Sequence, residues 1–266
     1  LVGTDEEGGD VVRASDNPQL SEAPYRSMRA LYAEGGTALL CAAEAEKCRM
    51  LRGLDVNVNF APVCDISDDP AAFMYARSLG LPPAETAAAI GEVVATYEAE
   101  NVGTVLKHFP GYGNAADSHT GVVYDDRDLA AFEGGAFLPF KAGIDAGADC
   151  VLVTHNIVPC VDGEAPASLS AAWHAVLRDT LGFAGVIITD DLSMGGVTDY
   201  TDGVSAAVAA VLAGNDMLCC TDFETQIPAV LRAVEDGTIS EARIDESVLR
   251  ILRWKLERGI IAARTE

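Results

Sequence analysis

The fold is decided by residues 185–191, which read Gly-Val-Ile-Ile-Thr-Asp-Asp and join an apolar run directly to two aspartates. A short, continuous apolar run of this kind is typical of a strand buried on both faces of a parallel sheet. The other runs of the same type lie at 1–4, 56–65, 103–108, 149–155 and 216–221. The sequence therefore predicts six strands, five of which end in a polar cluster.

Segments with helical patterning separate these strands. The last of them starts near Ser240 and is expected to stop at Gly259, a residue type favoured just after a helix end. Alternating strands and helices predict right-handed βα units and a parallel sheet. No Pro- or Ser-rich linker interrupts the chain, so we expect a single domain over residues 1–266. The predicted helices cover 27–52, 84–101, 130–146, 171–181, 204–213, 224–236 and 240–258.

Two α/β architectures fit this alternation. A closed TIM-type (β/α) barrel needs eight strands, whereas six strands also suit an open, doubly wound sheet. We favour the barrel because the polar clusters all follow strand ends. The chain opens at Leu1 as if inside a strand. We therefore expect that the first two βα units of the barrel are lacking at the N-terminus, and that the open edge pairs with another chain.

The amino-acid composition limits the classes of molecule that the chain is expected to bind. Eighteen Lys and Arg face 41 Asp and Glu, giving a formal net charge of −23. Such a surface repels phosphate backbones, so no nucleic-acid partner is expected, and it disfavours anionic lipid. No apolar run is long enough to predict a membrane-spanning segment. The seven cysteines are odd in number and lack metal spacing, which favours a reducing compartment without a disulfide framework.

Asp190 directly follows the apolar run at 185–189. A carboxylate held at such a strand end can act as a nucleophile. Both Asp190 and Asp191 are also suited to cap the following helix, and for Asp191 we favour the cap.

A second candidate group lies in the loop that carries Asp117 and His119. A carboxylate beside an imidazole fixes the tautomer and raises the basicity of the ring, as proton transfer requires. A solvated loop is an alternative, and so is a metal pair with His155 as third ligand. Lys107 and His108 close another strand, where the lysine suits sugar hydroxyls, a carboxylate or a plain ion pair.

These strings occur in one order over nearly the whole chain and resemble family 3 glycoside hydrolases, in the β-N-acetylglucosaminidase branch. The block from Lys-His-Phe-Pro-Gly to Asp-Ser-His is specific to that branch. The matching segments are 3–9 with 12–13, 59–65, 77–78, 107–113, 117–119, 166–170, 177–178, 182–186 and 189–194.

The resemblance implies a retaining β-N-acetylhexosaminidase with a TIM-type barrel, no cofactor and no metal. It implies that Asp190 is the nucleophile and His119 the general acid and base, with Asp117 as partner of the histidine. Asp65 is assigned to structure. The residues that match positions binding the N-acetylglucosamine ring are Asp5, Arg13, Arg77, Lys107 and His108.

The implied substrates are N-acetylglucosaminides from muropeptides or chitooligosaccharides. Two alternatives stay open: an inactive or assembly-dependent sugar-binding barrel fragment, and a β-glucosidase of the same family. The chain departs from the branch at Glu6, where Gln is usual, at Leu79 and Tyr112, and in the loop 114–116, which is one residue shorter than is frequent.

Overall fold

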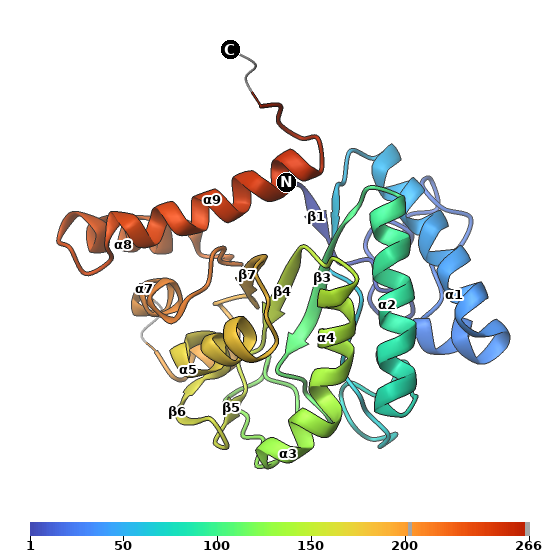
Figure 1. Cartoon of the computed structure of the whole chain (residues 1–266), viewed down its shortest axis with the longest axis horizontal. Helices are drawn as coiled ribbons and strands as arrows, with labels where there is room; N and C mark the ends of the chain where they lie inside the picture. Colours follow the sequence, from blue (N-terminus) through green and yellow to red (C-terminus); the bar gives the residue numbers. More distant parts are fainter. Residues whose placement is uncertain (202–203, 264–266) are drawn as a thin grey trace.

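The computed structural model describes residues 1–201 and 204–263. Its centre is a five-stranded parallel sheet in the order β1-β2-β3-β4-β7, which forms a half-barrel (Figure 1). The α/β prediction with a parallel sheet is thereby confirmed. The strands are β1 (Gly3–Thr4), β2 (Val58–Asn59), β3 (Gly103–Phe109), β4 (Cys150–Val153) and β7 (Val186–Thr189).

The predicted helices lie within a few residues of the observed ones, and polar caps fix the starts of several of them. The Ser27 hydroxyl accepts from the Ala30 N–H, and the Ser240 hydroxyl accepts from the Arg243 N–H. The helices are α1 (Met28–Gly53), α2 (Pro83–Ala99), α3 (Leu129–Ala131), α4 (Phe137–Asp145), α5 (Ala171–Ala175), α6 (Gly195–Thr198), α7 (Val204–Ala213), α8 (Phe223–Glu235) and α9 (Glu241–Glu257).

Three predicted helices are less regular than expected. The helix predicted over 27–52 is kinked at Gly35 and Gly36, whose backbone angles are not helical. The helix predicted over 130–146 changes to a π-helical turn over Phe132–Ala136, which contains Gly134 and Gly135. The helix predicted over 171–181 ends in a second π-helical turn over Val176–Thr180. Such turns interrupt α-helices locally without ending the coil.

The predicted sixth strand, 216–221, is wrong as a strand. Met217 makes a single parallel bridge to Ile188, and the Asp216 and Met217 N–H groups share the Ile187 carbonyl. The segment therefore follows β7 without building a ladder. The predicted strand 56–65 is also shorter, since Pro62 has no N–H to donate to the ladder.

A small hairpin between β4 and α5 was not predicted. Its strands β5 (Ile157–Val158) and β6 (Asp162–Pro166) pair antiparallel in a sheet of their own. Its strands are too short for alternating polar and apolar residues to distinguish them from the neighbouring loop in the sequence.

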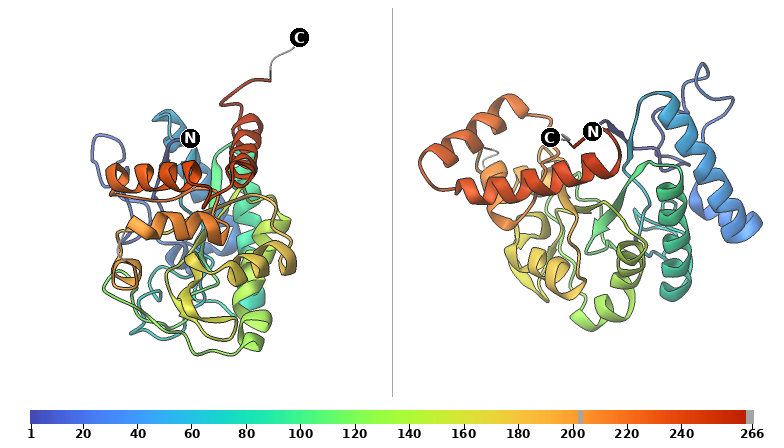
Figure 2. Two further views of the ribbon diagram at one scale, coloured as in Figure 1. Left: turned by 90° about the vertical axis from the view of Figure 1, so that its left-hand side faces the viewer. Right: turned by 45° about the horizontal axis from the view of Figure 1, so that its top comes forward.

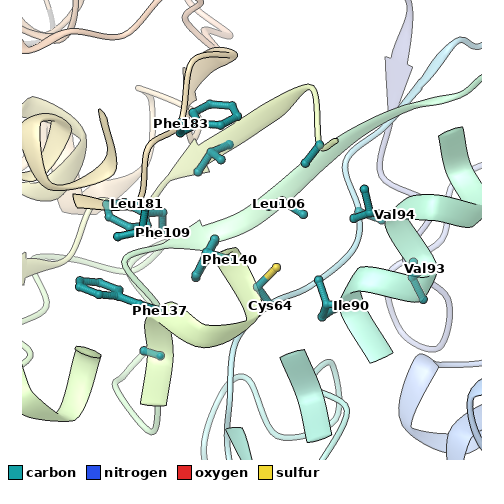
Figure 3. Packing of buried hydrophobic residues seen from close by; sticks show 14 of the residues in the cluster. Cys64, Ile90, Val93, Val94, Leu106, Phe109, Phe137, Phe140, Leu181 and Phe183 are labelled. Atoms are coloured by element: carbon teal, nitrogen blue, oxygen red, sulfur yellow. The ribbon is translucent and has the colours of Figure 1, made fainter. Parts of the chain in front are cut away.

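The sheet has one apolar cluster on each face, because side chains alternate along each strand. In β4, Val151 and Val153 face the helices, while Cys150 and Leu152 face the inside of the half-barrel. Between sheet and helices, Phe109 lies beside Phe137 and Phe140 (Figure 3). Its ring contacts those of Phe137, Phe140 and Trp173, with centroid distances of 5.4–6.0 Å. This layer holds β3 rigidly in place, and β3 carries Lys107 and His108.

Helix α9 lies across the amino-terminal end of the sheet, close to the first residue of the chain (Figure 2). Trp254 of this helix is buried against the inner cluster, and Arg258 binds Asp149 just before β4. The opposite, carboxyl-terminal end of the sheet is left to the polar loops. No helix among the described residues is long and apolar enough to cross a membrane.

Candidate active site

The polar segments that follow the strands meet around one cavity of about 700 Å³. That volume lies within the ~300–1,000 Å³ typical of small-molecule sites. Of the eight residues predicted for the site, seven line this cavity, and Asp117 lies behind His119. The seven are Asp5, Arg13, Arg77, Lys107, His108, His119 and Asp190.

Asp190 follows β7 directly and its half-buried side chain faces the cavity. Burial tends to raise the pKa of this carboxyl. The neighbouring His155 and His108, the Asp191 N–H and Lys107 outweigh it and hold the pKa of Asp190 below its usual value. The Asp191 N–H donates to one carboxylate oxygen at 2.9 Å. Asp190 is therefore ionised, as a nucleophile must be.

Asp191 does not cap the following helix, contrary to the prediction. Helix α6 begins at Gly195, and Met194 stands at its N-cap position. The Asp191 carboxylate accepts the Ser193 N–H at 2.9 Å and the Thr221 hydroxyl. Its side chain thus fixes the turn after β7 and binds it to the segment that follows α7.

Asp117 and His119 form a close pair. One Asp117 oxygen accepts both the His119 backbone N–H at 2.9 Å and the ring Nδ1–H at 2.5 Å. The imidazole side chain is 53% exposed, and its edge meets the ring of Phe73. With Nδ1 held by the carboxylate, Nε2 is the atom left to exchange a proton with a ligand in the cavity.

The loop that carries this pair is attached to the segment that carries Asp190. The N–H groups of Gly195 and Gly196 donate to the carbonyls of His119 and Ser118, at 3.3 and 3.0 Å. A Cβ atom at residue 195 would lie 2.8 Å from the Gly121 nitrogen, so the close approach requires glycine there. The predicted nucleophile and the predicted acid are thus held together by backbone contacts.

Glu7 is a site residue that sequence reasoning missed. Its buried carboxylate accepts from Arg77 at 2.6 and 2.9 Å and pairs with Lys107 at 2.6 Å. Burial raises the pKa of Glu7, but Lys107 and Arg77 outweigh it and lower that pKa to about 2. Lys107 also donates to Asp5 at 2.6 Å. One carboxylate therefore positions two of the cations in the cavity wall, Arg77 and Lys107.

His108 is oriented from behind by Asp65. Its Nδ1–H donates to Asp65 at 2.7 Å, and its Nε2 accepts from Arg77 at 3.2 Å. The second Asp65 oxygen accepts the Tyr112 N–H at 2.7 Å. The fully buried Asp65 does not line the cavity, which agrees with the structural role expected for it.

Arg13 reaches the cavity on a loop that Glu6 organises. The buried Glu6 carboxylate accepts the N–H groups of Arg13 and Ala14, at 2.9 and 2.7 Å, and the Ser15 hydroxyl. The Arg13 guanidinium donates to the Val12 carbonyl and is exposed. The Glu6 side chain thus holds the loop entirely by accepting hydrogen bonds, which a carboxylate can do without donating any.

His155 is not placed as a third metal ligand. Its Nδ1 accepts from the Ser168 hydroxyl at 2.7 Å, and its Nε2–H donates to the Asp191 carbonyl at 3.0 Å. Burial lowers the pKa of this histidine, although the nearby Asp190 opposes that shift. Within residues 1–201 and 204–263, no group of three His, Cys, Asp or Glu side chains is arranged to hold a metal ion.

A parallel half-barrel with ionisable side chains around a cavity at the carboxyl ends of its strands is arranged as barrel enzymes arrange their active sites. The chain belongs to glycosyl hydrolase family 3, because the model of the family's N-terminal domain matches residues 1–254. This confirms the family resemblance predicted from the sequence.

Relatives of the chain carry glycosidase names. It is 34% identical over 250 residues to a β-hexosaminidase of Xanthomonas campestris, covering 92% of this chain and 74% of the relative. A β-hexosaminidase of Methylococcus capsulatus is 31% identical and is covered to 80%, with all of this chain aligned. The structure of a family 3 β-N-acetylglucosaminidase from a Paenibacillus species superposes with a TM-score of 0.91 at 33% identity. All of this chain aligns there, and it spans about half (51%) of that protein's length.

Proposed function

We propose that this chain is the catalytic domain of a retaining β-N-acetylhexosaminidase. It removes terminal β-linked N-acetylglucosamine from muropeptides or chitooligosaccharides. The observation that carries the proposal is that the Asp190 carboxylate and the Asp117–His119 pair face one sugar-sized cavity. The names of the relatives support the choice of sugar. As a further part of the proposal, residues 1–266 act as one barrel domain.

In the first step, an Asp190 oxygen attacks the anomeric carbon of the bound sugar. The bond from that carbon to the glycosidic oxygen breaks, and His119 gives its Nε2 proton to the leaving oxygen. The product is a glycosyl ester of Asp190. Asp117 stabilises the imidazolium that precedes this transfer, because its oxygen accepts the Nδ1–H.

In the second step, the neutral His119 takes a proton from water at Nε2. The resulting hydroxide attacks the anomeric carbon, and the ester bond to Asp190 breaks to restore the carboxylate. Two displacements at the same carbon retain its configuration. Most retaining glycosidases use two carboxylates for this chemistry, whereas here an aspartate–histidine pair supplies the acid and base. No cofactor enters either step.

The sugar ring is held by the other polar side chains that line the cavity. The Asp5 carboxylate, the buried Lys107 ammonium and the Arg77 guanidinium all present hydrogen-bonding atoms in the cavity wall. Because Glu7 and Asp65 fix the orientation of the cations and of His108, little rearrangement is needed on binding. Arg13 contributes from the exposed side of the wall.

Release of nitrophenol from aryl glycosides tests the proposal. The β-N-acetylglucosaminide should be hydrolysed much faster than the β-glucoside, and Asp190→Ala should abolish turnover. Asp145→Asn is the matched control, since this exposed residue of α4 pairs with Lys141 and does not line the cavity. A chain that prefers the glucoside is a β-glucosidase, and turnover that survives Asp190→Ala contradicts the proposed nucleophile.

A second candidate, an assembly-dependent barrel, is favoured by exposed apolar surface. Leu231 on α8 and Leu249 on α9 are 57% and 61% exposed, and Ile227 and Leu252 lie on the same two helices. Strands β1 and β7 form the edges of the sheet. Sedimentation velocity at rising concentration tests self-association, with Leu231→Glu/Leu249→Glu as the variant expected to sediment as a monomer.

A further inference from the structure

The active-site cavity carries more negative than positive charge. The groups counted are those that line it or bind directly to a lining side chain. Protonation of both His108 and His119 would not reverse the balance. The permanent cations are Arg13, Arg77 and Lys107, and the carboxylates are Asp5, Glu7, Asp10, Asp65, Asp117 and Asp190.

Two of these cations are already neutralised by the protein. Arg77 binds Glu7 through two nitrogens, and Lys107 pairs with both Asp5 and Glu7. Among the described residues, Arg13 is the lining cation that forms no ion pair. An anionic ligand therefore finds one unpaired cation in a wall where carboxylates predominate.

Asp10 contributes an unpaired negative charge to the exposed part of this wall. Its carboxylate has no ion pair or hydrogen bond with any residue in the described part of the chain. A fixed turn presents it, in which the Glu7 and Gly8 N–H groups donate to the Val11 carbonyl at 3.0 and 3.1 Å. Gly8 has a φ of 98° and lies so close to the Arg26 carbonyl that no side chain fits there. The position of Asp10 is thus set by the backbone.

We infer that the cavity selects the sugar beyond the cleaved bond by its charge, and that Asp10 is a specificity-determining residue. It accepts a neutral or ammonium-bearing sugar, as in partly deacetylated chitooligosaccharides, over one that carries a carboxylate. A cavity lined predominantly by one sign of charge attracts the opposite sign and repels its own. The inference rests on the proposed function and chooses between its two substrate classes.

Three β-linked disaccharides test the inference. Each has N-acetylglucosamine at the non-reducing end, followed by glucosamine, N-acetylglucosamine or N-acetylmuramic acid. We expect kcat/KM to fall in that order, by about tenfold between the ends, and the spread to shrink in high salt. Asp10→Asn should reduce the spread severalfold. Asp16→Asn makes the same charge change on the same loop outside the cavity and should leave the spread unchanged.

Binding of the same disaccharides to the Asp190→Asn protein, by calorimetry, gives the preference without turnover. The same order of Kd supports the inference. Equal or tighter binding of the carboxylate-bearing disaccharide overturns it, and so does an equal response of Asp10→Asn and Asp16→Asn. Failure of the aryl N-acetylglucosaminide assay instead overturns the proposed function, and the binding order still decides the charge preference.

Discussion

The two ends of the sheet carry similar charged side chains that are used differently. At the amino-terminal end, the buried Asp216 carboxylate accepts from Arg178 at 2.6 Å, from Arg250 at 2.9 Å and from the Ser247 hydroxyl. At the carboxyl-terminal end, Asp190 accepts one backbone N–H and faces a cavity. Carboxylates satisfied by several donors hold the fold together, and those left partly unsatisfied beside a cavity are free for chemistry.

After the loss of the Asp190 carboxylate, His119→Ala should have the largest effect on activity at the cavity end. Without a proton donor, substrates with poor leaving groups should lose about 10²–10⁴-fold in kcat. Activated aryl substrates, which need less protonation, should lose much less in the glycosylation step. The measurement compares kcat/KM for a disaccharide and for a dinitrophenyl glycoside. Equal losses on both substrates would contradict a role as general acid.

Asp216→Asn tests whether the carboxylate at the amino-terminal end of the sheet stabilises the fold. Removing the charge that three arginines surround should lower the free energy of unfolding by about 3–5 kcal/mol. Activity of the folded protein should hardly change, because Asp216 is remote from the cavity. Denaturant unfolding measures the loss. Asp145→Asn breaks only an exposed pair with Lys141 and should cost about 0–1 kcal/mol.

Glu7→Gln asks whether a buried carboxylate at the cavity end also stabilises the fold. The folded-state pKa of Glu7, about 2, lies below its ordinary value of 4.5. Its stabilisation is therefore complete above pH 4.5 and is lost as the pH falls toward 2. One pKa unit is worth ~1.4 kcal/mol, so wild type should lose about 3 kcal/mol more than Glu7→Gln over this range. Urea titrations at several pH values measure the difference.

The same substitution should also act on binding. Without Glu7, Arg77 and Lys107 lose their common partner, so KM should rise about tenfold while kcat falls less. Glu98→Gln is the control, because its exposed carboxylate pairs with Arg258 at the amino-terminal end. A Glu7→Gln protein with wild-type KM would show that the cations hold their positions without it.

Gly195→Ala should produce the smallest effect. The added methyl group would meet the Gly121 nitrogen and the His119 carbonyl, and so displace the loop that carries His119. A small displacement of a reacting group lowers the rate, and we expect kcat to fall about tenfold with little change in stability. Gly134→Ala places the same group in open space and should leave kcat unchanged.

Much of this molecule follows from sequence alone. The apolar strand 185–189 and the polar residues after it predict both a parallel sheet and a site at its carboxyl edge. His119 and Asp190 meet there because parallel strands end at a common edge. The family resemblance assigned roles that spacing left open, since Asp117 and His119 also suited a solvated loop or a metal pair.

What the sequence did not predict depends on contacts between distant segments. Glu7 stands in a recognised motif, but its role depends on Arg77, 70 residues away, and on Lys107. The segment 216–221 is apolar enough for a strand, yet it bridges to β7 only at Met217. An apolar pattern predicts that a segment is buried. It does not predict how many hydrogen bonds the segment forms with a neighbouring strand.

The backbone contact between residues 118–121 and the glycine pair at 195–196 bears on redesign of this enzyme. The two segments lie so close that a side chain at residue 195 would collide with the backbone of the loop. A transplanted loop therefore has to keep this backbone contact, or His119 loses its support beside the cavity. Engineers should exchange the two segments together.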